Sequence, residues 1–537
     1  MIKSLSLLIK HFGIFTLIRF IFYPIILLFW GPYRFIVTLW NSRILAKGKW
    51  SDYISFGVPQ SLNQLFYRTQ IINIDRYGRN GISPYLSLGN YHLGYWWHLS
   101  LPASYIYYAM GAVLPIFSLF GWLFMHSFWL IDPNTDINYF FLVIILVIFS
   151  STFFANTFVI QNYNSLGWIL FPLAIWALHN EFIFLLPLIW LIISLGSITV
   201  VLMGFLLSLV IAINDQNFLI FFTFIPVIIK ILFHFYWSLS LDSKTNNAPG
   251  LKKSLIRTVK SIGISSIGVK YKRVSSKSVS KTFILFLLIY LQFGIIVFYL
   301  DESSAIIWTA GILIFIINNL AIRFADVQSI HMLMLSVATY LAITVTSPLL
   351  IMSFWLVISP PPYVLNDRVS NSPIDLPSPL SPFNIQKIIE KVEFFLRTIN
   401  QNDRVLFTFD NPNGNYENVF DGYRSLLEVP LYVATKRKFL LIPSWWAVFE
   451  NNFEGAKDFW GREIEKVNEN VEKFNANYVI TYNQESSDID SFISNGYSPI
   501  SEIDWSNLSD ELLDEAVWQS KTPPKWILYK VVNNLKV

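Results

Sequence analysis

The residues best suited to chemistry gather in one polar stretch, Trp50–His98, which follows the first strongly apolar run of the chain. It contains two isolated carboxylates, Asp52 and Asp75. A carboxylate beside apolar surface can have its pKa raised and act as a general base. Guanidinium groups bind phosphate oxygens bidentately, and flat aromatic rings suit the C–H faces of sugars. The candidates for binding a substrate are Arg68, Arg76, Arg79, His92, Trp96, Trp97 and His98.

Each of these residues also has a structural interpretation. Asp52 is a suitable N-cap for a helix beginning at Tyr53. Asp75 can pair with Arg76 and Arg79 and shape a turn before the following glycines. Aromatic side chains also gather at membrane interfaces, and arginines there bind lipid head groups. The residue types alone leave these alternatives open.

Several kinds of chemistry are excluded by composition and spacing. The chain has no cysteine, so structural disulfides, thiolate catalysis and Cys-ligated metal centres are ruled out. No pair of histidines has the spacing of a zinc protease, and neither glycine-rich nucleotide-binding motif is present. A divalent metal held by carboxylates stays open as a cofactor.

Composition predicts that the elements positioning these residues lie in a membrane. Hydrophobic residues make up 54% of the 537 positions and charged residues only 14%, whereas a soluble protein has about a quarter. The charge is unevenly divided. Residues 1–359 hold 22 Lys and Arg against 10 Asp and Glu, and residues 360–537 hold 17 against 25, so the two parts carry +12 and −8. Because the folded tail is acidic, no nucleic acid is expected as a partner.

Apolar runs of about 20 residues predict a polytopic α-helical membrane domain of about nine spans over residues 1–359. The predicted spans are Gly13–Trp30, Leu101–His126, Tyr139–Phe158, Leu166–Leu178, Phe182–Ile213, Phe218–Tyr236, Phe283–Leu300, Ala305–Leu320 and Met332–Ile358. Of these, Leu166–Leu178 is short and Phe182–Ile213 is too long for one upright span.

Charge predicts the orientation of these spans. The connection at residues 239–281 holds nine Lys and Arg against Asp242 alone, so it is expected on the cytoplasmic side. Three spans then bring the C-terminal domain to the opposite side. Counting backwards makes residues 41–100 an external loop. The predicted location is therefore an inner or plasma membrane, with the C-terminal domain extracytoplasmic.

A proline-rich segment marks the domain boundary. Residues 360–382 hold seven prolines, typical of a stiff linker. Residues 383–537 are predicted to form a small soluble α/β domain, because strand-like and helical apolar patterns alternate there. The predicted strands are Arg404–Phe409, Lys438–Ile442, Tyr478–Tyr482 and Trp526–Val532, and the predicted helices are Ile385–Ile399, Arg462–Phe474 and Ser509–Trp518.

The order of these parts resembles the GT-C superfamily of polyprenyl-phosphate-sugar-dependent membrane glycosyltransferases. The matching parts are the first apolar run, the long polar loop after it, the later spans and the terminal domain. The runs Asn164–Trp168, Ala476–Tyr482 and Lys525–Tyr529 also look like that family. The family's loop commonly has paired acids, whereas this loop has only Asp52 and Asp75.

The resemblance implies a transferase that moves a sugar from a polyprenyl-phosphate-linked donor to a glycan, lipid or protein acceptor on the outer face of the membrane. Asp52 or Asp75 would deprotonate or orient the acceptor hydroxyl, and Arg68, Arg76 or Arg79 would stabilise the leaving phosphate. Membrane lipid would be a further partner, and a divalent metal is optional in such enzymes. The alternatives are a non-catalytic assembly or anchoring protein that displays its C-terminal domain, and a transporter or flippase of lipid-linked glycans.

Overall fold

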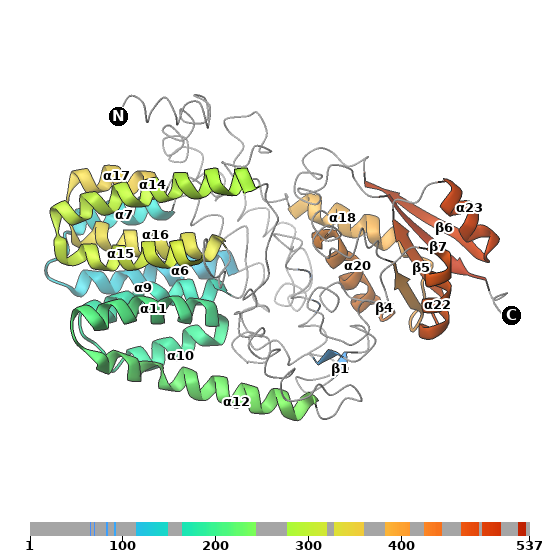
Figure 1. Ribbon diagram of the computed structural model, residues 1–537, viewed down its shortest axis with the longest axis horizontal. Helices are drawn as coiled ribbons and strands as arrows, with labels where there is room; N and C mark the ends of the chain where they lie inside the picture. Colours follow the sequence, from blue (N-terminus) through green and yellow to red (C-terminus); the bar gives the residue numbers. More distant parts are fainter. Residues whose placement is uncertain are drawn as a thin grey trace, which may run out of the picture. The chain divides into compact units, whose positions relative to one another are not determined.

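The computed structural model describes residues 65, 69, 82–83, 91–92, 114–148, 164–242, 276–318, 327–358, 382–408, 424–442, 463–482, 486–505 and 525–532. The chain divides into two compact units. Residues 114–235 and 276–358 belong to a helical unit, and residues 382–532, with the gaps given, belong to an α/β unit. Figure 1 shows the helices of the first and the sheet of the second.

The helical unit consists of helices whose axes run largely alongside one another (Figure 1). Neighbouring contacts join α6 to α9, α9 to α10, α11 to α15, α14 to α15 and α15 to α16. The elements are α6 (Leu114–Ser127), η3 (Phe128–Ile131), α7 (Ile137–Ile148), α9 (Asn164–His179), α10 (Leu186–Gly196), α11 (Ile198–Asn214), η5 (Phe218–Phe224), α12 (Ile225–Asp242), α14 (Ser276–Leu300), α15 (Glu302–Ile316), α16 (Val327–Thr344) and α17 (Pro348–Ile358).

Short polar residues set where several of these helices begin. The Ser197 hydroxyl accepts a hydrogen bond from the backbone N–H of Val200 and caps α11. The Asp136 carboxylate accepts from the backbone N–H groups of Asn138 and Tyr139, at 2.8 and 3.2 Å, and starts α7 in the same way. These caps divide apolar sequence into separate helices.

Tryptophans pack against glycines in the interior of the helical unit. A Cβ atom at Gly204 would lie 2.5 Å from the ring of Trp190, so only glycine permits this approach of the ring to α11. Trp190 is fully buried and stacks on Phe224 with ring centroids 5.0 Å apart. This close packing fixes α10, α11 and η5 against one another.

Large apolar side chains are also exposed on the outer faces of the helical unit. Phe120, Phe124, Phe222 and Phe233 are each more than 60% exposed, and Met352 is 73% exposed. With hydrophobic residues at 54% of the chain, more apolar surface is present than the two cores enclose.

The prediction of a polytopic membrane domain is corrected by the lengths of the helices. Within the described ranges, no helix is both long enough and apolar enough to cross a membrane. Met332–Ile358 is divided between α16 and α17, and Phe182–Ile213 is divided at Ser197. In α14, the only described helix of more than 18 residues, the first turns carry Lys277 and Lys281. The expected location as an integral protein of an inner or plasma membrane, with an extracytoplasmic C-terminal domain, rested on the same spans and is corrected with them.

The α/β unit is built on a mixed five-stranded sheet with the strand order β4-β3-β5-β7-β6. The strands are β3 (Arg404–Phe407), β4 (Leu440–Ile442), β5 (Tyr478–Tyr482), β6 (Tyr497–Asp504) and β7 (Lys525–Val531). β4, β3 and β5 are parallel, whereas β7 is antiparallel to both β5 and β6. The helices are α18 (Pro382–Phe395), α20 (Arg424–Arg437), α22 (Ile464–Phe474) and α23 (Ser486–Ser494).

Four of these strands lie where the apolar runs predicted them, within three residues at each end. Helices α18 and α22 likewise overlap the predicted segments Ile385–Ile399 and Arg462–Phe474. The sequence did not predict β6, whose burial alternates weakly and whose middle residues are exposed. The predicted helix Ser509–Trp518 lies outside the described residues.

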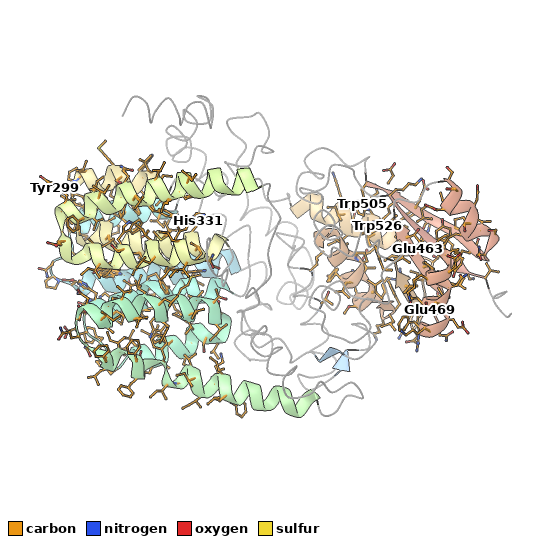
Figure 2. The ribbon with its side chains drawn as sticks, in the orientation of Figure 1. Tyr299, His331, Glu463, Glu469, Trp505 and Trp526 are labelled. Atoms are coloured by element: carbon orange, nitrogen blue, oxygen red, sulfur yellow. The ribbon has the colours of Figure 1, made fainter. Side chains whose placement is uncertain are left out.

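Aromatic rings form the centre of the α/β core. Trp526 on β7 and Trp505 after β6 are fully buried, and their rings meet edge to face at 5.1 Å (Figure 2). Phe407 on β3 meets Trp526 at right angles, with centroids 5.5 Å apart. These contacts join the parallel and antiparallel parts of the sheet.

Candidate functional site

A polar cavity of about 410 Å³ lies within the helical unit, at the connections between its helices. Asp132 follows η3, His179 ends α9, Asp215 follows α11, Asp301 precedes α15, and Thr344 ends α16. The apolar runs form the helices, so the polar residues between them come together at one end of the unit. We call this cavity the acidic pocket.

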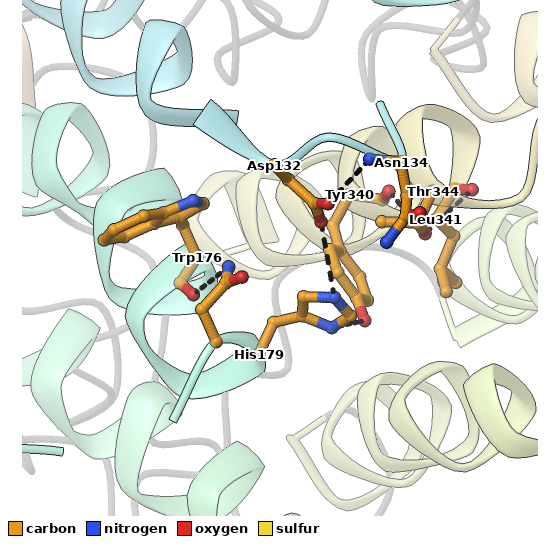
Figure 3. A network of polar contacts seen from close by, with 8 residues as sticks. Asp132, Asn134, Trp176, His179, Tyr340, Leu341 and Thr344 are labelled. Atoms are coloured by element: carbon orange, nitrogen blue, oxygen red, sulfur yellow. Dashed lines mark hydrogen bonds and ion pairs between the residues drawn. The ribbon is translucent and has the colours of Figure 1, made fainter. Parts of the chain in front are cut away.

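The most specific arrangement in the acidic pocket is a chain of three side chains, Asp132, His179 and Tyr340. The Tyr340 hydroxyl lies 2.9 Å from Nδ1 of His179, and Nε2 of the same ring lies 4.0 Å from Oδ2 of Asp132. Figure 3 shows the imidazole between the carboxylate and the phenol. Aspartate and imidazole in sequence form the kind of pair that moves protons in general acid–base catalysis.

Both rings of this chain are held by packing. Trp129 is fully buried in η3, and its ring lies 5.2 Å from Tyr340 and 5.7 Å from His179, centroid to centroid. Oδ1 of Asp132 accepts a hydrogen bond of 2.9 Å from the backbone N–H of Asn134 (Figure 3). Asp132 is 12% exposed and His179 38%, so an external molecule can reach the space between them.

Two further carboxylates line the acidic pocket. Asp215 is the C-cap of α11 and accepts from the side-chain amide of Asn214 at 2.8 Å. The Ser304 hydroxyl donates to Asp301 at the start of α15. Both carboxylates are thereby held at the ends of their helices.

The electrostatic character of the acidic pocket is negative. None of the described residues that line it is Lys or Arg. Burial raises the pKa of the Tyr340 hydroxyl, and the charges of Asp301, Asp132 and Asp215 raise it further, in that order. Burial lowers the pKa of His179, and the nearby Asp132 opposes this. At neutral pH the phenol therefore keeps its proton and the imidazole carries no charge.

A buried amine also stands out in the helical unit but does not line the acidic pocket. Nζ of Lys230 on α12 donates to the backbone oxygen and to the hydroxyl of Ser194 on α10, at 2.5 and 3.0 Å. Burial lowers the pKa of Lys230 to about 6. The two hydrogen bonds connect α12 to α10, which is a structural role.

The residues predicted as sites from the sequence are largely outside the described part of the chain. This holds for Asp52 and Asp75, for Arg68, Arg76 and Arg79, and for Trp96, Trp97 and His98. The backbone of His92 lies in β2 (Tyr91–His92), paired antiparallel to β1 (Ile82–Ser83). The roles expected for these residues stay predictions.

Sequence reasoning missed Asp132, His179 and Tyr340. The available signal was that Asp132, Asp215 and Asp301 each interrupt long apolar sequence and lie between two predicted helices. No local pattern connects Tyr340, in the middle of an apolar run, to a histidine 161 positions earlier. A divalent metal is not supported by the described residues, because no group of three His, Asp or Glu among them is arranged to hold one.

Comparison with known proteins gives no family assignment. No family model, curated protein or solved structure matches the chain.

Proposed function

We propose that the protein is a glycosyltransferase and that the acidic pocket binds the acceptor hydroxyl. The observation that carries the proposal is the Asp132–His179–Tyr340 chain at the wall of a polar cavity. The donor class, a sugar linked to a polyprenyl phosphate, comes from the resemblance of the sequence to the GT-C superfamily.

The gap between Asp132 and His179 suits a hydroxyl group. The two atoms are 4.0 Å apart, too far for a direct hydrogen bond. An oxygen atom about 2.8 Å from each would bridge them with an angle of roughly 90° at the oxygen. It would donate its proton to the carboxylate and accept a hydrogen bond from the imidazole.

The transfer step balances with Asp132 as the general base. The acceptor oxygen forms a bond to the anomeric carbon of the donor sugar while the bond from that carbon to the phosphate oxygen breaks. The phosphate leaves with the electron pair, and the acceptor proton passes to Oδ2 of Asp132 and then to solvent. General base catalysis of this kind contributes about 10² to 10⁴ in rate.

The charge of the acidic pocket supports an acceptor site over a phosphate site. Three carboxylates and the carbonyl ends of α9, α11 and α16 lie there, and both disfavour a nearby anion. Neutral hydroxyl groups are good ligands for such a surface, because carboxylates accept their hydrogen bonds. The leaving phosphate would be stabilised elsewhere, and Arg68, Arg76 and Arg79 are the sequence candidates for that role.

The test is sugar transfer by the purified full-length protein. Radiolabelled polyprenyl-phosphate sugars would be supplied with a panel of glycan acceptors, and the labelled product would be separated from the donor. Asp132→Asn should lower kcat by about 10² to 10⁴ while KM for the acceptor changes little, because the amide retains the shape and the hydrogen bond to Asn134.

The matched control is Asp136→Asn. Asp136 lies four residues from Asp132 and caps α7, and asparagine caps a helix as well as aspartate does. This variant should retain full activity. Asp52→Asn and Asp75→Asn, tested beside it, distinguish the acidic pocket from the sequence candidates. Full activity of Asp132→Asn would refute its role as the base, and absence of transfer with every donor would refute the glycosyltransferase proposal.

A further inference from the structure

Tyr340 is the residue of the acidic pocket that touches His179 on the side away from Asp132. Its hydroxyl lies 2.9 Å from Nδ1, and its ring is almost fully buried against Trp129. Because Trp129 packs on both rings, neither the phenol nor the imidazole can turn without disturbing a buried tryptophan. The geometry therefore fixes which nitrogen faces Asp132.

The direction of the Tyr340–His179 hydrogen bond follows from the charges around it. A neutral imidazole has one N–H group, on Nδ1 or on Nε2. Nε2 lies 4.0 Å from the Asp132 carboxylate, and a negative charge at that distance favours a proton on Nε2. Nδ1 then has the lone pair and accepts a hydrogen bond from the Tyr340 hydroxyl.

The phenol is a dependable donor in this position. Burial and the charges of Asp301, Asp132 and Asp215 all disfavour loss of its proton. These carboxylates come from three separate connections, before α7, after α11 and before α15, so the field does not depend on one loop. No Lys or Arg among the described lining residues opposes it.

We propose that Tyr340 is a positioning residue that holds neutral His179 as the Nε2–H tautomer, so that the imidazole donates a hydrogen bond to the acceptor oxygen while Asp132 accepts the acceptor proton. This inference rests on the proposed function. In the other tautomer, the lone pair of Nε2 would face both the carboxylate and the acceptor oxygen. The hydroxyl would then have two acceptors and only one proton, and it would bind poorly between them.

The helical unit contains a second tyrosine–histidine pair that serves as a matched control. The Tyr290 hydroxyl lies 2.6 Å from Nδ1 of His331, and both residues are buried. Neither lines the acidic pocket. Tyr290→Phe removes the same kind of hydrogen bond as Tyr340→Phe without touching the proposed site.

The experiment combines nitrogen NMR with kinetics. Full-length protein labelled with ¹⁵N-histidine, in wild-type form and as the two Tyr→Phe variants, gives the tautomer of each imidazole from its nitrogen chemical shifts at pH 7.5. The wild type should show His179 with the proton on Nε2. Tyr340→Phe should increase the Nδ1–H form of His179 and leave His331 unchanged, and Tyr290→Phe should do the reverse.

The kinetic expectation separates positioning from stability. Tyr340→Phe should lower kcat about tenfold, the usual effect of losing one hydrogen bond, and the rate should change its dependence on pH between 5 and 8. Tyr290→Phe should leave kcat and that profile unchanged even if it lowers the melting temperature.

The outcomes distinguish the two proposals. An Nδ1–H tautomer of His179 in the wild type would overturn the role of Tyr340, and this result needs no variant to fold. An unchanged tautomer and unchanged kcat in Tyr340→Phe would overturn it as well. If the tautomers behave as expected but the wild type transfers no sugar, the hydrogen-bond assignment holds and the glycosyltransferase proposal fails.

Discussion

Acidification should destabilise the helical unit because His331 is buried where a charge has no compensation. His331 lies on α16, 4% exposed, with the ring of Phe286 4.1 Å away and the Tyr290 hydroxyl on Nδ1 (Figure 2). Burial lowers the pKa of His331 from its usual 6.5 to about 3. The unfolded chain therefore binds a proton at this residue at pH values where the folded chain does not.

The direction and size of the effect follow from linkage. Above pH 6.5 the imidazole is neutral in both states, and the stability is at its highest. As the pH falls from 6.5 towards 3, only the unfolded state is protonated, so the free energy of unfolding falls. Each pKa unit corresponds to about 1.4 kcal/mol, so His331 accounts for about 2 kcal/mol at pH 5 and about 5 kcal/mol at pH 3.

The assay is hydrogen exchange of full-length protein, measured by mass spectrometry on peptides from α14 and α16. Exchange at several urea concentrations and at pH 5 to 7.5, corrected for the intrinsic pH dependence of exchange, gives the local free energy of opening. In His331→Gln, the slope of this free energy at pH 5.5 should decrease by about 1.2 kcal/mol per pH unit. The amide can still accept the hydrogen bond of Tyr290.

The control for this prediction is His179→Gln. His179 is 38% exposed and lies near Asp132, so its replacement should change the slope less than that of His331. A slope in His331→Gln equal to that of the wild type would refute the reasoning, because it would mean that the buried imidazole has the same proton affinity in both states.

Two further predictions concern the α/β unit. Trp526→Ala should lower its free energy of unfolding by about 3 to 5 kcal/mol, because the ring fills the space between Trp505 and Phe407; urea unfolding followed by circular dichroism measures this, and Trp526→Phe should cost less. Asn475 ends α22 in the left-handed conformation, with φ of 49°, so Asn475→Ala should cost about 1 kcal/mol in the same assay whereas Asn475→Gly should cost nothing or stabilise. Equal stability of the alanine and glycine variants at Asn475 would contradict this account.

The apolar patterns predicted individual elements well where a helix or strand is defined by its own residues. Arg404–Phe409 and Tyr478–Tyr482 were identified as strands because short β-branched and aromatic runs end at polar residues, and β3 and β5 lie there. Helix α22 follows from its apolar positions repeating along one face. These are local properties, and the chain expresses them locally.

The sequence misled where length decided the class of protein. The run Met332–Ile358 looked like one span, but it breaks at Ser347–Pro348 into α16 and α17. Proline is favoured in the first turn of a helix and serine before it, yet neither interrupts an average of hydrophobicity. The membrane prediction counted apolar residues and could not count the breaks between them.

By itself, the sequence determined which segments are helical, which are strands, and that the charged residues would lie between apolar runs. Only the tertiary structure decided that Asp132, His179 and Tyr340 meet. The reason is physical: helices α7, α9 and α16 pack through apolar faces that contain no record of the polar residues at their ends. Which ends come together depends on how those faces fit, and that fit is a property of the whole unit.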